Sequence, residues 1–321
     1  MKLHIISADG RGQIDPTMHR SILLQIPGMT SSLQDADAVI VPVSHFQDYT
    51  FNSRLREIRV PVILLDMMEY YGRSSAVETH FFGVNHDAAI NISHSDEWRH
   101  FHEWVRENPP VLYFKRELLS ADVSDRRIPI EWPCVLPAWQ EEPKVNFDTR
   151  PFEVFYNWGY SNGLRPRLAG EILCLMADGK IEVVSSFDHV DAAMHKSNRR
   201  WISIHSPHTH RAHIDQIMLR QAQSKMSVSM PGAGVKCFRS AEHIVHTVPV
   251  KLKDELAWSF PWIHGENCLE MQPGDMGGQL DEFTRRSDLH SIYLGSRELA
   301  DRYREGRYVS GYIMPNIIMR L

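Results

Sequence analysis

"KMSVSMPGAGVKCFRSAEHI" (residues 225–244) carries a strand, a turn and the start of a helix in direct succession. Its first part is a short apolar run over residues 226–230, which is typical of a strand buried on both faces of a sheet. Pro231, Gly232 and Gly234 then end the strand, because proline and glycine both interrupt strands. A strand that leads through a glycine turn into a helix is the repeating part of an α/β fold.

The same succession recurs along the chain, which predicts parallel sheets covered by helices on both faces. Helical patterns, in which apolar residues return after three and four positions, cover residues 95–107, 165–179 and 213–225. They alternate with apolar runs that suit buried strands, namely Leu3–Ser7, Ala38–Val43, Pro61–Asp66, Val111–Phe114, Phe152–Tyr156, Ile181–Ser185, Trp201–Ile204, Met226–Met230 and Ile244–Val250.

The length of the chain, 321 residues, exceeds one ordinary hydrophobic core and fits two domains of roughly 150 residues each. The polar stretch over residues 137–151 holds three prolines and is the expected linker. We therefore expect two Rossmann-like βαβ domains that face a cleft, over residues 1–144 and 145–300. The tail over residues 301–321 is expected to dock on the body, and whether it crosses back to the N-terminal domain stays open.

The composition is that of a folded globular protein, with 43% hydrophobic and 23% charged residues. A formal net charge of −5 and a pI near 6.4 give no global electrostatic reason to bind nucleic acid or an anionic membrane. The sequence has no signal-peptide pattern and no apolar stretch of membrane-spanning length, so we expect a cytoplasmic protein without membrane insertion. The four cysteines are widely spaced and contain no C-x-x-C pair, so small buried apolar residues are expected rather than disulfides.

The loop after the expected strand at residues 152–156 is the first candidate binding site. It contains Gly159 and Gly163 and leads into a helix whose start carries Arg165 and Arg167. Glycines let the backbone approach a ligand, and a helix N-terminus offers unpaired N–H groups to an anion. A phosphate or diphosphate suits this place, although an ordinary βα turn has the same pattern.

The opening stretch supplies the second candidate. Arg239 and Glu242 follow Gly232 and Gly234 and lie three positions apart in the first turns of the expected helix, so they share a face. An arginine can hold phosphate oxygens with two hydrogen bonds, and a glutamate can accept from a ribose diol. The alternative is a surface ion pair of little energetic weight.

The first half of the chain supplies carboxylates at strand ends. The run over residues 61–66 ends in Asp66, and Glu69 follows it. The carboxyl end of a strand faces the ligand crevice of an open α/β sheet, so Asp66 is a candidate general base, with a helix cap as the alternative. Asp9 and Gly10 follow the first strand and could line the same crevice.

A histidine cluster is the candidate for a metal site. His205, His208, His210 and His213 lie close together in the sequence. There is no H-E-x-x-H motif or carboxylate series beside them, so we do not predict a metal site, and metal binding there stays the alternative.

The two loops resemble those of glycosyltransferases of the GT-B family. The pattern Y-x-x-G-x-x-x-G-x-R at Tyr156–Arg165 and F-R-x-x-E at Phe238–Glu242 is similar to loops of phage DNA β-glucosyltransferases and exostosin-type enzymes. The resemblance implies that the second domain binds a nucleotide-sugar and the first an acceptor. It also implies that Arg165 and Arg239 contact the diphosphate, Glu242 the ribose, and Asp66 acts as base.

The expected function is therefore transfer of a sugar from a nucleotide-sugar, with a UDP- or GDP-sugar as co-substrate and no cofactor. The acceptor would be a glycan or a hydroxymethylated DNA base. Arginines and helix N-terminal amides can stabilise the departing diphosphate, so a divalent metal is optional, and attack assisted by Asp66 would invert the anomeric carbon. The alternatives are a GT-B-like epimerase, a metal-dependent hydrolase that uses the histidines, and a non-catalytic nucleotide- or glycan-binding protein. The sugar, the nucleotide and the oligomeric state stay open.

Overall fold

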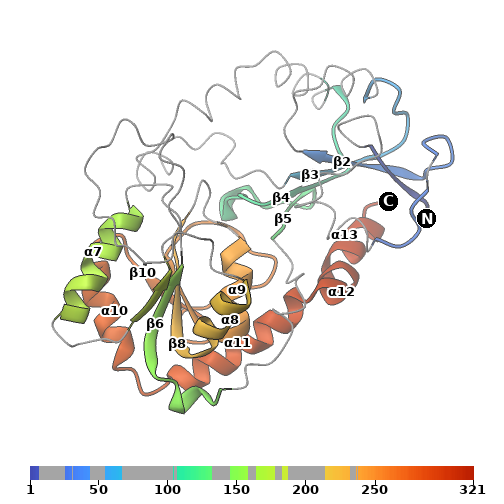
Figure 1. Cartoon of the computed structure of the whole chain (residues 1–321). Coiled ribbons are helices and arrows are strands. Elements are labelled where there is room, and N and C mark those ends of the chain that lie inside the picture. The colour runs from blue at the N-terminus through green and yellow to red at the C-terminus, as the bar shows by residue number, and fades with distance from the viewer. Residues whose placement is uncertain are drawn as a thin grey trace.

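The fold comes from a computed structural model of the whole chain (Figure 1). The structure describes residues 1–6, 26–30, 32–43, 55–66, 104, 107–131, 145–157, 164–177, 183–186, 214–231, 236 and 238–321.

The first of two parallel sheets keeps its strands in the order of the sequence. All of its neighbouring strands pair in parallel, so their carboxyl ends lie at one edge. Its strands are β1 (Leu3–Ile5), β2 (Ala38–Val43), β3 (Val62–Asp66), β4 (Leu112–Lys115) and β5 (Arg127–Pro129).

The second sheet is also parallel, but its strand order is β10-β9-β8-β6-β7. Its first strand in the sequence, β6, therefore lies inside the sheet, and the strand order reverses beside it. Its strands are β6 (Phe152–Asn157), β7 (Val183–Ser186), β8 (Ser224–Ser229), β9 (Val248–Leu252) and β10 (Leu269–Met271).

Helices pack on both faces of the second sheet, with α7 and α10 on one side and α8, α9 and α11 on the other (Figure 1). This double cover buries the central strands on both faces, so that even Ser224, Ser227 and Ser229 of β8 are buried. The described helices are α7 (Leu164–Ala177), α8 (Ile214–Ala222), α9 (Phe238–His246), α10 (Met276–Thr284), α11 (Leu289–Tyr303), α12 (Glu305–Tyr308) and α13 (Met314–Ile318). Short 3-10 turns cover Ser120–Asp122 and Phe147–Thr149, and a π-helical turn, Val309–Ile313, joins α12 to α13.

The two faces of the first sheet are covered by different parts of the chain. One face packs on residues from the segments that connect the strands, among them Leu55, Ile58 and Trp104. The opposite face packs on the last helices of the chain, through residues such as Tyr308 and Ile313. Right-handed crossovers between strands in sequential order all pass on one side of a sheet, so the other side needs a cover from elsewhere.

Most expected strands and helices are present, and the differences have local causes. The expected strand Ile244–Val250 is wrong at its start, because residues 244–246 form the last turn of α9 and β9 begins at Val248. Ile244 and Val245 are buried on the side of α11, and a short apolar run alone does not distinguish a helix end from a strand. The expected strand Trp201–Ile204 and most of the expected helix 95–107 lie outside the described residues. The domain boundaries stay predictions.

Cysteine and membrane expectations can be compared with the described part of the chain. Cys268 is buried as expected, and burial raises the pKa of its thiol to about 12. Cys174 is exposed on α7, against expectation, because the apolar stripe of this helix leaves that position on its outer side. No helix in the described ranges is both long and apolar enough to cross a bilayer.

Candidate functional site

The strand order of the second sheet reverses beside β6, with β7 on one side of it and β8 on the other. The chain leaves β6 towards β7 on one side and returns through α8 to β8 on the other side. Ligands of open α/β sheets bind at the carboxyl ends of the strands, at the place where the strand order reverses. Tyr156 pairs with Val228, so the ends of β6 and β8 lie side by side.

The candidate donor-binding residues follow these two strand ends. Gly159 and Gly163 come after β6 and Gly232 and Gly234 after β8, and all four lie outside the described residues. The helix after each loop is described, so the positions of the arginines on the backbone are known.

Helix α7 begins at Leu164, which places Arg165 in its first turn. Helix α9 begins at Phe238, which places Arg239 in its first turn and Glu242 three positions later. The expected helix starts are therefore confirmed. What the side chains of Arg165, Arg239 and Glu242 contact stays a prediction.

Arg167 has defined partners on the exposed side of α7. Its Nε donates to Glu171 Oε1 at 3.0 Å, and its terminal nitrogen donates to the Gly274 carbonyl at 3.0 Å. Glu171 in turn accepts from the Gly277 N–H at 2.6 Å. This arginine therefore connects α7 to the start of α10, and a role in donor binding stays a prediction.

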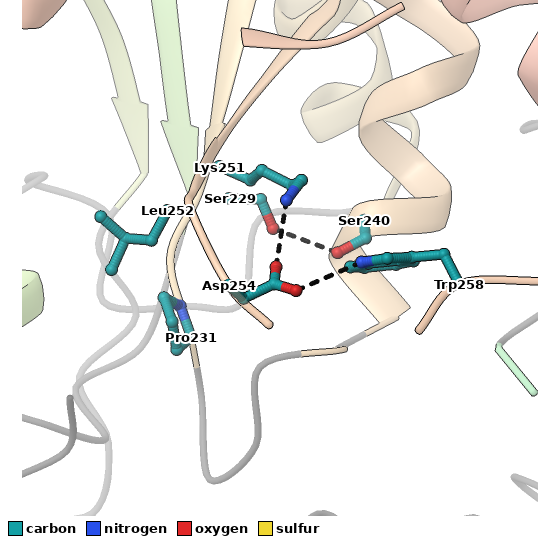
Figure 2. A pocket seen from close by; sticks show the side chains of 7 residues that line it. All are labelled: Ser229, Pro231, Ser240, Lys251, Leu252, Asp254 and Trp258. Atoms are coloured by element: carbon teal, nitrogen blue, oxygen red, sulfur yellow. Dashed lines mark hydrogen bonds and ion pairs between the residues drawn. The ribbon is translucent and has the colours of Figure 1, made fainter. Parts of the chain in front are cut away.

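A pocket opens beside the carboxyl ends of β8 and β9, next to the segment that follows β8 (Figure 2). It is small, with room for about one water molecule. The end of β8, the first turn of α9 and the segment after β9 all contribute to its wall. The lining residues are Ser229, Pro231, Ser240, Lys251, Leu252, Asp254 and Trp258.

Lys251 is the cation of this pocket and pairs with two carboxylates. Its ammonium lies 3.0 Å from Asp254 Oδ2 and 2.7 Å from Glu270 Oε1, and 5.6 Å from the centre of the Trp258 ring. Burial opposes the charged form, but the two carboxylates outweigh it and raise the pKa of Lys251. Asp254 also accepts from the Trp258 indole N–H at 3.3 Å. The ammonium is therefore a buried cation held by two carboxylates near the end of β9.

Hydroxyl groups complete the pocket. Ser229 at the end of β8 and Ser240 on α9 lie 3.4 Å apart through their hydroxyl oxygens, as Figure 2 shows.

Our sequence analysis named Pro231 only as a residue that ends a strand, and it assigned no binding role to any residue that lines this pocket. The expected strand Ile244–Val250 ended one residue before Lys251, so the polar residues after β9 were not placed at a strand end. The signal that could have found them is the acidic and basic run over residues 251–255, directly after an apolar segment.

The first sheet places Asp66 at the carboxyl end of its central strand. The side chain is buried, and its Oδ2 accepts from the Tyr113 hydroxyl at 2.5 Å and from Lys115 Nζ at 3.0 Å. Both partners lie on β4, where Asp66 pairs directly with Lys115. They were missed because nothing local in the sequence predicts which strand lies beside β3. Glu69, Asp9 and Gly10 lie outside the described residues.

The histidine cluster, His205 to His213, also lies outside the described residues. Within the described part of the chain, no group of three or more His, Cys, Asp and Glu side chains is arranged to hold a metal ion.

Comparisons with known proteins support the fold. No protein-family model matches the sequence, and no curated protein matches it. The crystal structure of the GtfA/B complex is similar over 88% of this chain and 57% of that chain, with a TM-score of 0.52 and 10% identity. This chain thus spans little more than half of that structure's length.

Two further solved structures match with lower TM-scores. The UDP-GlcNAc 2-epimerase from Neisseria meningitidis, bound to UDP-GlcNAc, matches over 99% of this chain and all of its own, with a TM-score of 0.46 and 10% identity. The glycosyltransferase SnogD from Streptomyces nogalater matches over 86% of this chain and 71% of its own, with a TM-score of 0.39 and 12% identity. We draw no argument from either.

Together, the two parallel sheets and the similarity to the GtfA/B complex confirm the expected fold, an α/β chain with two Rossmann-like domains of the GT-B type. At 10% identity the similarity shows fold alone. It does not show the resemblance of the loops to phage DNA β-glucosyltransferases and exostosin-type enzymes, which stays a prediction.

Proposed function

We propose that this chain is a glycosyltransferase that moves a sugar from a nucleotide-sugar to a hydroxyl acceptor. One observation carries the proposal. The two glycine-containing loops singled out in the sequence follow β6 and β8, the two strands between which the second sheet reverses its order. That is the ligand position of open α/β sheets, and the chemistry of both loops suits a diphosphate.

The donor would bind at the second sheet. Gly159, Gly163, Gly232 and Gly234 would let the backbone approach the diphosphate. Arg165 and Arg239, with Arg167 nearby, would supply positive charge at the starts of α7 and α9, and Glu242 would accept from the ribose hydroxyls. The donor proposed is a UDP- or GDP-sugar.

The proposed reaction mechanism depends on stabilising the charge that develops when the sugar is transferred. Cleavage of the bond between sugar and diphosphate leaves negative charge on the departing phosphate, which fixed arginines and helix N-terminal amides stabilise. This route needs no cofactor, and a divalent metal is optional. Asp66, with Glu69 beside it in the sequence, would take the proton from the acceptor hydroxyl and invert the anomeric carbon. Asp9 and Gly10 would lie on the acceptor side, and the acceptor would be a glycan or a hydroxymethylated DNA base.

A thermal-shift screen tests the donor half of this proposal. UDP, GDP, CMP, ADP and their sugars are added to the parent chain, to Arg239→Ala and to Glu242→Ala, because a ligand that binds only the folded state raises Tm. Arg285→Ala is the matched control, because Arg285 is an exposed arginine directly after α10 that pairs with Asp281.

The expected result is that one nucleotide raises the Tm of the parent and the control, and raises it much less in Arg239→Ala and Glu242→Ala. A screen in which no nucleotide shifts the parent would contradict the proposal. Equal shifts in all four proteins would place the nucleotide elsewhere.

A further inference from the structure

Lys236 is a buried lysine within the segment proposed to hold the donor. It follows Gly234 by two residues and precedes the start of α9, and only 1% of it is exposed. Its ammonium donates to Glu131 Oε1 at 2.5 Å and to the Ala257 carbonyl, and lies 4.7 Å from the centre of the Trp258 ring. Its backbone N–H donates to Glu117 Oε1 at 2.9 Å. Side chain and main chain are thus both held by carboxylates of the first sheet's segments.

The carboxylate of Glu131 accepts hydrogen bonds from four parts of the chain. It follows β5, and besides Lys236 it accepts from the Ser259 N–H at 3.0 Å. It also accepts from the hydroxyls of Tyr303 and Tyr308, each at 3.3 Å. Segments before α9 and after β9, and helices α11 and α12, therefore meet at the end of the first sheet.

A lysine at this position needs those carboxylates. The N-terminal end of a helix carries partial positive charge, so an ammonium just before α9 is unfavourable by itself. A buried charge without a partner is strongly destabilising, and Glu131 supplies the opposite charge. The ammonium is also enclosed by Glu131, Ala257 and Trp258, so its contacts lie within the protein.

Glu117 connects this contact to the candidate base. Lys115, two residues before Glu117, donates to Asp66 at 3.0 Å. The short segment over residues 115–117 therefore holds Asp66 with one side chain and the backbone of Lys236 with another. A backbone hydrogen bond between Ala257 N–H and the Leu118 carbonyl, at 2.8 Å, extends the same junction.

We infer that Lys236 is a positioning residue that couples the donor loop to the edge of the first sheet that carries Asp66. This inference rests on the proposed function for the identity of the donor loop. Lys236 holds the end of that loop against Glu117 and Glu131. The segment over residues 115–117, which includes Glu117, also orients Asp66 through Lys115. Nucleotide bound at the loop then orders residues 115–117 across the junction.

Hydrogen exchange tests the coupling in two arms, in the parent, Lys236→Met and the control Lys225→Met. Lys225 lies on β8, near the amino end of the strand. The first arm has no ligand, and the second adds UDP or GDP. Both are run well below the Tm of each variant, so that local opening rather than global unfolding is measured.

Without nucleotide, we expect amide exchange over residues 115–120 to rise at least about fivefold in Lys236→Met and to stay unchanged in Lys225→Met. With nucleotide, we expect protection of these residues in the parent and the control. In Lys236→Met this protection should be lost while nucleotide Kd stays within about threefold of the parent. If Lys236 only stabilised the fold, Lys236→Met would lower Tm, but bound nucleotide would still protect residues 115–120.

Three results would overturn the inference. One is unchanged exchange over residues 115–120 in Lys236→Met, and another is nucleotide protection that persists there. The third is a rise in nucleotide Kd as large as in Arg239→Ala, which would make Lys236 a ligand contact. If neither UDP nor GDP binds the parent, the proposed function fails, and the ligand-free arm alone decides whether Lys236 couples the two sheets.

A double variant distinguishes loss of the Lys236–Glu131 pair from misfolding caused by one unpaired buried charge. Glu131→Gln leaves Lys236 buried without its partner, whereas Glu131→Gln combined with Lys236→Met removes both charges. We expect the double variant to exchange over residues 115–120 no faster than Lys236→Met alone. Clearly additive effects would show that the two side chains do not act as a pair.

Discussion

The two sheets differ in strand order, and the difference assigns them different roles. The first sheet runs from β1 to β5 in sequence order, so its connections cover one face and the other face relies on the last helices of the chain. The second sheet reverses its order between β6 and β8, and helices cover both of its faces. Strand order thus makes the first sheet dependent on distant helices and gives the second sheet the reversal at which we propose that the donor binds.

The largest effect is expected from replacing the candidate base, which should impair transfer at the first sheet without impairing donor binding at the second. In Asp66→Asn, we expect the transfer rate to fall by about 10²- to 10⁴-fold, the usual effect of losing a general base. Nucleotide affinity should stay unchanged, because the donor binds at the second sheet. Steady-state kinetics measure the transfer rate, and a nucleotide titration measures the affinity. Asp122→Asn, at an exposed position, is the control. Loss of nucleotide binding, or unimpaired transfer, would contradict this division.

A second variant tests how far the first sheet depends on the last helices. Ile317 on α13 is 1% exposed and packs in the core of the first sheet, whereas its neighbour Ile318 is 61% exposed. Ile317→Ala should lower the free energy of unfolding by about 2–5 kcal/mol because it leaves a cavity.

Ile318→Ala is the matched control and should change the free energy of unfolding by at most about 0.5 kcal/mol. Denaturant unfolding gives both values, and hydrogen exchange shows where the change occurs. Faster exchange in β8 than in β2 and β3 would show that the helix does not serve the first sheet in particular.

The tyrosines at the junction should make stability depend on alkaline pH. Burial and the charge of Glu131 raise the pKa of Tyr308 well above its ordinary value. The folded chain therefore keeps the proton where the unfolded chain loses it, so stability should fall as pH rises beyond about 10.

In Tyr308→Phe, we expect that alkaline decline to become shallower. At neutral pH the variant should lose about 1–2 kcal/mol, because the hydroxyl accepts from the Glu131 N–H at 2.9 Å. Urea unfolding from pH 7 to 11 gives both quantities. An alkaline decline as steep as in the parent would show that Tyr308 does not contribute to it.

The smallest effect is expected from Arg167. Its side chain is 53% exposed and already bonds Glu171 and the Gly274 carbonyl. Arg167→Ala should change nucleotide affinity by less than about threefold and stability by less than about 1 kcal/mol. A tenfold or larger loss in a nucleotide titration would instead make Arg167 a main diphosphate contact and shift the site towards α7.

Local sequence patterns predicted much of the architecture. Apolar runs that end in turn residues predicted most described strands, and glycines before helical patterns predicted the starts of α7 and α9. The position of Asp66 at a strand end was predicted because an apolar run ends in this carboxylate, and its role as a base stays a prediction.

What the sequence could not predict depends on contacts between distant segments. Lys236 and Glu131 are 105 positions apart, and no periodicity in either segment predicts their meeting. The sequential order of the first sheet and its cover by the last helices are likewise long-range features. The pocket around Lys251 and Asp254 was missed because one apolar run contains both the end of α9 and most of β9.

A crystal structure of the chain with UDP, and a second with GDP, would test the central claim most directly. We predict one nucleotide with its diphosphate at the carboxyl ends of β6 and β8, between the starts of α7 and α9, and with its ribose at Glu242. A nucleotide bound against the first sheet, or a diphosphate far from Arg239, would contradict the account.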